Sequence, residues 1–457
     1  MDFIATVEWR FFMRVGWAMC IVLGIMTVFA SAVFPDILAD KDKMSVRDGV
    51  LYLGKNPFMM RAVRISEMAL RSTAPSEWAA TFARIADVGG NAVCFTLPGY
   101  AADGSLSPGA ARTINTIMDA ALWRRMGGLC RILPKKALED KEKCLVMVRS
   151  AAAVLKNENR LVYWIDGPDP DELVKAFREV APGLVVAAKS GGDIEVVEKL
   201  ADKPPVRSKK TTRGQAKPTE KPLLLSGKLP PAERLGTVHF VLPGNEQSYE
   251  DLEAAMKNPA ESAEWTPDNS TLSERERAEG FVSLFNGKTL DGWWFLGANT
   301  KGFAVENGAI VWKAEGGRAL YTRDRYDNFI LRLEWKINKG GNSGIYLRAP
   351  RAGRQSKIGM EFQLQGDAGQ PVTNQTSGAI YDVVAPRMNA TKPPGEWNTV
   401  EILLEGGRFR AVMNDQVVQE TNLTENDELR TRLRRGFIGL QDHGTFVAFR
   451  NIRVKKL

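Results

Sequence analysis

The chain has 457 residues, with 62 Lys and Arg against 54 Asp and Glu, so its formal charge is +8. This length predicts two or three domains, and a composition of 44% hydrophobic and 25% charged residues excludes a collagen-like or wholly disordered chain. Seven Lys and Arg against one Glu lie in residues 203–222 alone. Because the rest is close to neutral, the basic balance does not indicate a nucleic-acid partner.

The N-terminus carries a candidate membrane segment. Arg10 and Arg14 precede residues 15–34, which contain no charge and are long enough to span a bilayer as a helix. Arginines before the span place residues 1–14 in the cytoplasm. We therefore expect a transmembrane helix that anchors the protein in the inner membrane of a bacterial cell envelope, with its domains on the periplasmic, extracytoplasmic side. The alternative is a signal peptide cleaved at Ala30–Ala32, which would give a secreted protein.

Residues 44–202 alternate short apolar runs with amphipathic segments, which is the pattern of a parallel β/α domain. The expected strands and helices are 58–65, 75–88, 91–97, 108–126, 129–133, 138–155, 161–165, 169–180 and 184–188. A sixth strand at 237–243 would extend this domain to include residues 236–257. Since little chain is left for eight strands, we expect a shortened β/α barrel-like domain.

Two stretches of this domain resemble the start of clan-A glycoside hydrolase barrels: "GKNPFMMRAVRISEM" and "EWAATFARIADVGGNAVCFTLPGYAADGSLS". Such enzymes use two carboxylates at strand ends, and the resemblance implies Asn-Glu at the end of the fourth strand. Here "LVYWIDGPDP" carries Asp166–Gly167 instead. We therefore expect a degenerate barrel with a scaffolding or sugar-contacting role, and Asp166 is the remaining candidate acid.

Residues 203–235 are rich in Lys and Pro and have no apolar periodicity, so we expect a flexible linker. The four cysteines (Cys20, Cys94, Cys130 and Cys144) show no CxxC or Cys/His spacing. We therefore expect buried thiols and no zinc site.

From residue 280 the pattern changes to period two. In "NFILRLEWKIN", apolar residues alternate with polar ones over Phe329–Ile337, as in a half-buried antiparallel strand. Similar short strands recur to the C-terminus, separated by Gly, Asn and Asp. Residues 280–457 are therefore predicted to form an all-β sandwich of the jelly-roll type.

Six motifs in this region occur in order: "FVSLFNGKTLDGWWF", "GNSGIYLR", "GMEFQLQGD", "SGAIYDVVAP", "PPGEWNTVEI" and "GFIGLQDHGTFVAFRNIRVKKL". Together they resemble the 3-keto-disaccharide hydrolase domain family, also described as 3-ketoglucoside-1,2-lyase and 2-hydroxyglucal hydratase. The resemblance implies a concanavalin-like jelly roll and a hydrolase or lyase activity on a 3-keto glycoside. It also implies an upstream sugar 3-oxidase as a functional partner.

The polar residues of these motifs define a candidate site. In "MEFQLQ", Glu361, Gln363 and Gln365 share one face of a strand, about 7 Å apart in succession. In "GIYLR", Tyr346 and Arg348 are expected to share a face in the same way. The further candidate substrate-binding residues are Asn342, Ser343, Asp367, Asp442 and Trp293.

Cleavage of a 3-keto glycoside by elimination needs a base for the C2 proton, a donor for the enolate oxygen and an acid for the leaving oxygen. His443 is suited to proton transfer, Glu361 could be the base or the acid, and Arg348 could stabilise the enolate. Asp442 could orient His443 if "DHG" forms a turn. Glu361 and Asp367 could hold a divalent cation, but no full ligand set is visible, so no cofactor is expected.

The alternative from another class is a non-catalytic carbohydrate-binding jelly roll on a degenerate glycosidase-like scaffold, since the fold alone does not decide function. A base and an acid that converge on one site would favour the enzyme over the carbohydrate-binding module. A third hypothesis, an adaptor in a surface protein complex, depends only on the linker.

Overall fold

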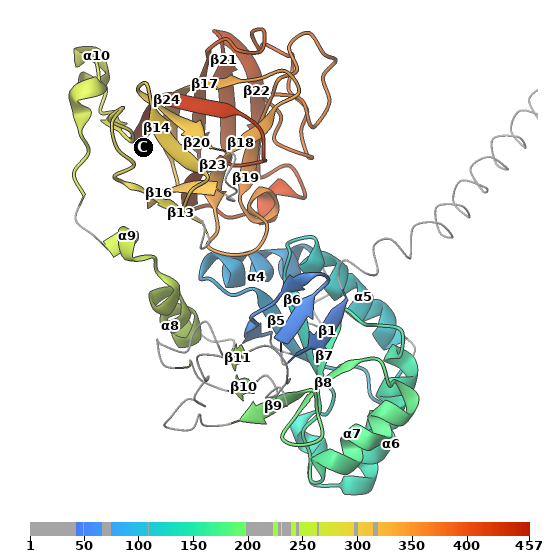
Figure 1. The fold of residues 1–457 in the computed structure, drawn as a ribbon. Helices are drawn as coiled ribbons and strands as arrows, with labels where there is room; N and C mark the ends of the chain where they lie inside the picture. Colours follow the sequence, from blue (N-terminus) through green and yellow to red (C-terminus); the bar gives the residue numbers. More distant parts are fainter. Residues whose placement is uncertain are drawn as a thin grey trace, which may run out of the picture.

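The computed structural model describes residues 43–48, 50–65, 75–107, 109–197, 223–226, 230, 239–243, 246–262, 265–296, 300–313 and 319–457. In the view of Figure 1, a β-sandwich lies above a β/α barrel. The predicted membrane segment 15–34 lies outside the described residues, as does the basic stretch 203–222. Within the described part of the chain, no helix is long and apolar enough to cross a bilayer.

The first domain is a closed barrel of eight parallel strands in the order β10-β11-β4-β5-β6-β7-β8-β9. The strands are β4 (Arg61–Arg64), β5 (Ala92–Thr96), β6 (Gly127–Arg131), β7 (Leu161–Trp164), β8 (Val185–Ala188), β9 (Ile194–Val197), β10 (Leu223–Ser226) and β11 (His239–Leu242). The expectation of a shortened barrel is therefore wrong. Likewise, β10 lies inside the stretch interpreted as a linker.

One missed strand, β9, has a local cause: the regular strand–helix spacing breaks down after β8. A five-residue turn, 189–193, leads directly from β8 to β9. Asp193 holds this turn, because its backbone N–H donates to the Val186 carbonyl (2.7 Å) and its carboxylate accepts from the Val186 N–H (2.9 Å). Strands of four residues without a helix between them give almost no periodic signal.

Helices cover the outside of the barrel (Figure 1): α4 (Pro75–Asp87), α5 (Gly109–Leu122), α6 (Lys141–Leu155), α7 (Pro170–Val180) and α8 (Glu246–Met256). A short helix, η1 (Lys135–Ala137), precedes α6. A small antiparallel sheet made of β1 (Met44–Arg47), β2 (Val50–Leu53) and β3 (Asn56–Pro57) contributes Met44 and Leu51 to the apolar interior of the barrel. Cys94, Cys130 and Cys144 are buried free thiols, as predicted.

The second domain is an antiparallel sandwich, as predicted. Its larger sheet has the order β14-β15-β24-β17-β20-β21-β22, with β12 paired to β24, and its smaller sheet has the order β13-β16-β23-β18-β19. The strands are β12 (Val282–Ser283), β13 (Trp293–Phe295), β14 (Phe303–Glu306), β15 (Ala309–Trp312), β16 (Ala319–Tyr326), β17 (Phe329–Ile337), β18 (Asn342–Ala349), β19 (Met360–Gln365), β20 (Asn398–Glu405), β21 (Arg408–Met413), β22 (Gln416–Asn422), β23 (Gly436–Gln441) and β24 (Val447–Lys456). Burial alternates strictly along β17, which confirms its predicted period of two.

Short helices complete this part of the chain: α9 (Pro259–Ser262), η3 (Asn269–Thr271), α10 (Glu274–Ala278), α11 (Gln355–Ile358) and η4 (Leu429–Thr431). The first three lie between the barrel and the sandwich in sequence. The four-residue helix α11 sits in the loop between β18 and β19 and was not predicted.

An ion-pair network joins the two domains where α4 faces the sandwich (Figure 1). Arg325 of β16 pairs with Asp87 at the end of α4 and with Glu253 of α8. Arg351 pairs with Glu261 (2.6 Å), and both of these side chains are almost fully buried. Since charges removed from water need their partners, this network fixes how the sandwich sits on the barrel.

Candidate functional site

The candidate residues gather on the outer face of the five-stranded sheet. Ile345 and Leu347 of β18 and Phe362 of β19 point into the sandwich core. On the opposite face, Glu361 pairs with Tyr346 across the two strands, and Gln363 pairs with Gly344. The predicted alternation of "MEFQLQ" is therefore confirmed.

Glu361 is a buried carboxyl group on this face, with only 3% of its surface exposed. Burial raises the pKa of Glu361 to about 8, although Arg354, a hydrogen bond from Gln441, Lys357 and Arg432 oppose the rise. Its carboxyl lies over Gly344, where an added Cβ would come within 2.4 Å of Oε1. Gly344 is therefore required for this placement, and Glu361 holds a proton at neutral pH.

Tyr346 supplies a hydroxyl beside this carboxyl. Its Oη accepts a hydrogen bond from Gln441 Nε2 (2.7 Å), which leaves the phenol O–H free to donate. Burial raises the pKa of Tyr346, so it stays neutral. Gln441 Oε1 is buried and has no partner among the described residues. Gln441 was not predicted, although alternation along "GFIGLQ" places it on the same face as Gly439.

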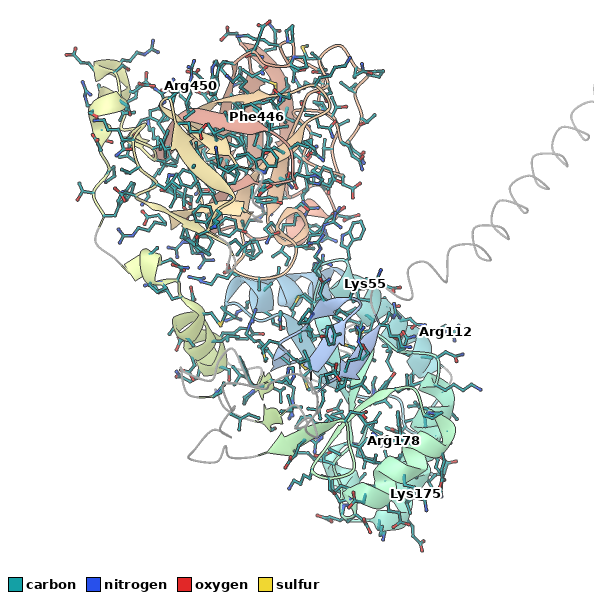
Figure 2. All side chains as sticks on the ribbon, in the orientation of Figure 1. Lys55, Arg112, Lys175, Arg178, Phe446 and Arg450 are labelled. Atoms are coloured by element: carbon teal, nitrogen blue, oxygen red, sulfur yellow. The ribbon has the colours of Figure 1, made fainter. Side chains whose placement is uncertain are left out.

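His443 lies in the exposed turn after β23, three residues before Phe446, which Figure 2 labels. Its Nε2 is 3.5 Å from Asn342 Nδ2, and Asn342 Oδ1 accepts from Gln363 Nε2 (3.0 Å). Gln363 Oε1 is buried and without a partner in the described structure. Polar contacts thus lead from His443 through Asn342 to Gln363.

The two proton-transfer candidates, Glu361 and His443, lie near neighbouring positions of β18. The Glu361 carboxyl lies over position 344 of β18, and His443 lies beside position 342. Two residues along an extended strand span about 7 Å. This separation is comparable to the width of a sugar ring.

Arg348 does not lie on the sheet face that carries Glu361 and Tyr346. The pairing of β18 with β23 shifts register between Tyr346 and Ala349, and Arg348 has a φ of +52°. Its Nε donates to the Asp327 carbonyl (2.8 Å) in the turn after β16, and its side chain is buried there. Burial lowers the pKa of Arg348 to about 10. The expected shared face with Tyr346 is therefore wrong, because a β-bulge redirects the side chain.

Three further candidates have structural contacts. Trp293 is 7% exposed and packs in the sandwich core, where its Nε1 donates to the Leu284 carbonyl (2.6 Å). The "DHG" segment does form a turn, but Asp442 Oδ1 accepts from Trp312 Nε1 (2.8 Å) and from the Gly444 N–H, not from His443. Ser343 is fully buried and donates to the Gln441 carbonyl.

Asp367 does not lie close enough to Glu361 to share a cation with it. The strand runs four residues from Glu361 to Gln365, about 13 Å, and Asp367 lies beyond it, accepting from the Ser377 N–H (2.9 Å). Within the described residues, no three His, Cys, Asp or Glu side chains form a group that could hold a metal ion. Gln365 continues the polar row of β19 and pairs with Asn342, the residue beside His443.

In the barrel, Asp166 follows β7, the fourth barrel strand along the chain. Its carboxylate makes a bidentate ion pair with Arg131 of β6, at 3.1 and 2.6 Å. Asp166 therefore serves as the counter-ion of a buried guanidinium.

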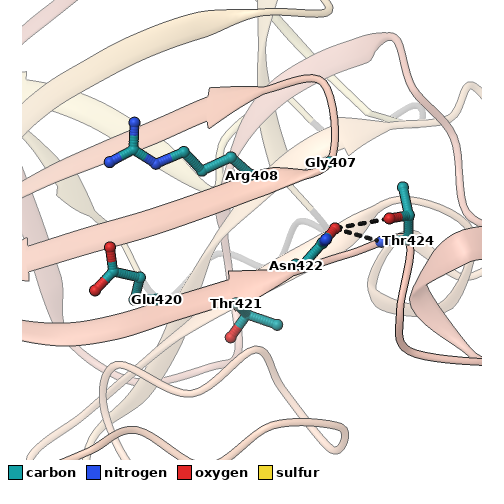
Figure 3. A pocket seen from close by; sticks show the side chains of 6 residues that line it. All are labelled: Gly407, Arg408, Glu420, Thr421, Asn422 and Thr424. Atoms are coloured by element: carbon teal, nitrogen blue, oxygen red, sulfur yellow. Dashed lines mark hydrogen bonds between the residues drawn. The ribbon is translucent and has the colours of Figure 1, made fainter.

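Figure 3 shows a surface cavity of about 430 Å³ on the larger sheet, between β21 and β22. Arg408, Glu420 and Asn422 line it, and it contains none of the candidate residues. This cavity is separate from the polar face described above.

Comparisons with known proteins find relatives of the sandwich. Residues 280–455 match the family described as 3-keto-alpha-glucoside-1,2-lyase-like domain. A 3-keto-disaccharide hydrolase from Bacteroides thetaiotaomicron is 29% identical over 46% of this chain and 89% of its own length. A solved structure from Parabacteroides distasonis, described as a glycosyl hydrolase, is 31% identical over 41% of this chain and 98% of its own, with a TM-score of 0.37. The sandwich of this protein therefore belongs to the 3-keto-alpha-glucoside-1,2-lyase-like domain family.

Proposed function

We propose that the sandwich cleaves 3-keto glycosides by elimination across C2 and C1, with water able to add afterwards. The observation that carries this proposal is a buried Glu361, whose pKa burial raises to about 8, on the same sheet face as the Tyr346 phenol and about two strand residues from His443. The family match supplies the substrate class.

In the proposed first step, His443 takes the proton from C2 of the 3-keto sugar, and the electron pair moves into the C2–C3 bond to form an enolate. The O–H of Tyr346 donates to the enolate oxygen. In the second step the C1–O bond breaks, and Glu361 gives its proton to the departing oxygen. Addition of water at C1, with return of the proton to C2, completes a net hydrolysis.

The unpaired amide oxygens suit the sugar hydroxyls. Gln363 Oε1 and Gln441 Oε1 are buried acceptors without partners among the described residues. Because an unsatisfied buried acceptor is costly, a hydroxyl donor from a bound sugar would satisfy each of them. A binding module would need these contacts but would not need the acid at Glu361.

The test uses the full chain with 3-keto-trehalose and, in parallel, unoxidised trehalose, followed by released glucose. We expect cleavage of the keto sugar alone, and its loss in Glu361→Gln and His443→Ala. Glu420→Gln is the matched control, since this exposed carboxylate lies on the other sheet (Figure 3). Binding of either sugar without cleavage would favour the non-catalytic carbohydrate-binding alternative.

We further propose that the protein works in the bacterial envelope, held by residues 15–34. The apolar sequence of that segment and the arginines before it support this location. A sugar 3-oxidase must supply the keto group, because nothing in the proposed reaction oxidises C3.

A further inference from the structure

A groove runs along the barrel where it meets the sandwich. It encloses about 710 Å³, and its walls come from α5, α6 and the loop that carries α11. The side chains used below are Trp123, Arg125, Arg160 and Arg354. The lining also includes Asp119 and Glu158, so its three arginines leave a net positive charge of one.

The arginines differ in their partners. Arg160 is neutralised by Glu158 and by Asp119 (2.6 Å). Arg125 and Arg354 form no ion pair with any residue that the structure describes, and Arg125 is exposed. Two guanidinium groups in one groove are thus available to a ligand.

The backbone presents Arg125 in an unusual way. It follows the end of α5 with a φ of +54°, a conformation that Gly or Asn adopts far more easily at this position. Its N–H donates to the Leu122 carbonyl, which closes the helix. An arginine here costs stability that a glycine would not, and this suggests that its side chain is used.

Trp123 provides a flat apolar surface beside these charges. It is 44% exposed, and Lys357 Nζ lies 4.0 Å from its ring centre, with the Arg354 guanidinium carbon at 5.5 Å. An exposed indole with cationic neighbours can stack on one face of a sugar ring.

Two arginines of the groove act electrostatically on the candidate active site. The charge of Arg354 acts on Glu361, and the charges of Arg125 and Arg354 act on Tyr346. The backbone N–H of Arg354 also donates to the Arg124 carbonyl (2.9 Å), so the α11 loop is fixed to the end of α5. One ligand could therefore contact the barrel and the sheet at once.

We propose that this groove binds the part of the glycan next to the cleaved sugar, and that Arg125 and Arg354 select a carboxylate-bearing sugar such as a uronic acid. Guanidinium groups recognise carboxylates through paired hydrogen bonds, and Trp123 would hold the ring of the same sugar. This inference deepens the proposed function and depends on it for the sugar that enters the sheet. It gives the barrel a role in specificity, without chemistry at Asp166.

The kinetic test compares two 3-keto disaccharides that differ in their second sugar, glucuronic acid or glucose. For the full chain we expect kcat/KM to favour the acidic substrate, and Arg125→Gln to reduce this preference by roughly tenfold or more. Arg125→Lys should keep part of it. Arg112→Gln is the control, because Arg112 is exposed near the start of α5 (Figure 2), about 15 Å along the helix from its last residue, Leu122.

A binding measurement separates the two proposals. Calorimetric titration with the unoxidised glucosyl-glucuronic acid disaccharide requires no turnover. Binding that Arg125→Gln weakens and Arg112→Gln does not would support the groove even if no keto sugar is cleaved. Equal use of the acidic and neutral substrates, with equal binding by the Arg125 variants, would overturn the inference while leaving the proposed function intact.

Discussion

Replacing Glu361 with Gln should change how the stability of the protein depends on pH. The pKa of Glu361 is raised from 4.5 to about 8 by burial, so between these values the folded protein holds a proton that the unfolded chain has released. The contribution of this proton to the free energy of unfolding is fully present below pH 4.5 and is lost as the pH rises towards 8. The loss is about 1.4 kcal/mol per pH unit, with an upper bound of about 5 kcal/mol. Glu361→Gln has nothing to titrate and should keep its stability.

The assay is thermal unfolding of both proteins at pH 5 and pH 9. Near pH 5 we expect similar midpoints. At pH 9 the variant should unfold several degrees higher, because each kcal/mol shifts the midpoint of a domain of this size by roughly 2–4 °C. If the wild-type protein kept its full stability at pH 9, the claim that Glu361 is buried with a raised pKa would be refuted. The rate of 3-keto glycoside cleavage should likewise fall above pH 8, where the acid has lost its proton.

Gly344→Ala should reduce kcat by about tenfold or more, because the added Cβ would lie 2.4 Å from Glu361 Oε1 and displace the carboxyl. An unchanged kcat would show that catalysis does not need the Glu361 carboxyl in this position. Tyr346→Phe should lower kcat roughly a hundredfold while leaving the affinity for unoxidised disaccharide nearly unchanged, and equal losses in both would assign Tyr346 to binding alone. Asp87→Asn should destabilise the protein by about 2 kcal/mol in denaturant unfolding, since Arg325 would keep only its pair with Glu253 at the domain interface. No change there would mean that the domains are joined by other contacts.

The local pattern of the sequence was sufficient for most of the fold. Helices α4 to α7 and strands β4 to β8 lie where apolar spacing placed them, because each of the strands β4 to β7 is followed by an amphipathic helix. The same reasoning failed at β9, where Asp193 closes a tight turn and no helix separates this strand from β8. Barrel closure depends on these long-range pairings, which a local pattern does not contain.

The site was predictable to a similar extent. Glu361, Gln363 and Tyr346 lie on one face because alternation along a regular strand fixes direction. Arg348 does not follow this alternation, because it lies at a bulge with a φ of +52°. No residue in "GIYLR" predicts a bulge.

Residues that reach the site from outside the sheet could not be found from strand patterns. Arg354 comes from the loop between β18 and β19, and Arg125 comes from another domain. Their proximity to Glu361 and Tyr346 follows from the packing of the sandwich on α4 and α5, which the ion pair of Asp87 and Arg325 maintains.

The central claim is removal of the C2 proton before the glycosidic bond breaks. Its most direct test is incubation of the full chain with 3-keto-trehalose in heavy water, with the recovered substrate and products examined by NMR. The account predicts deuterium at C2, and no incorporation in His443→Ala. Cleavage with the original proton retained at C2 would contradict elimination and indicate direct displacement at C1.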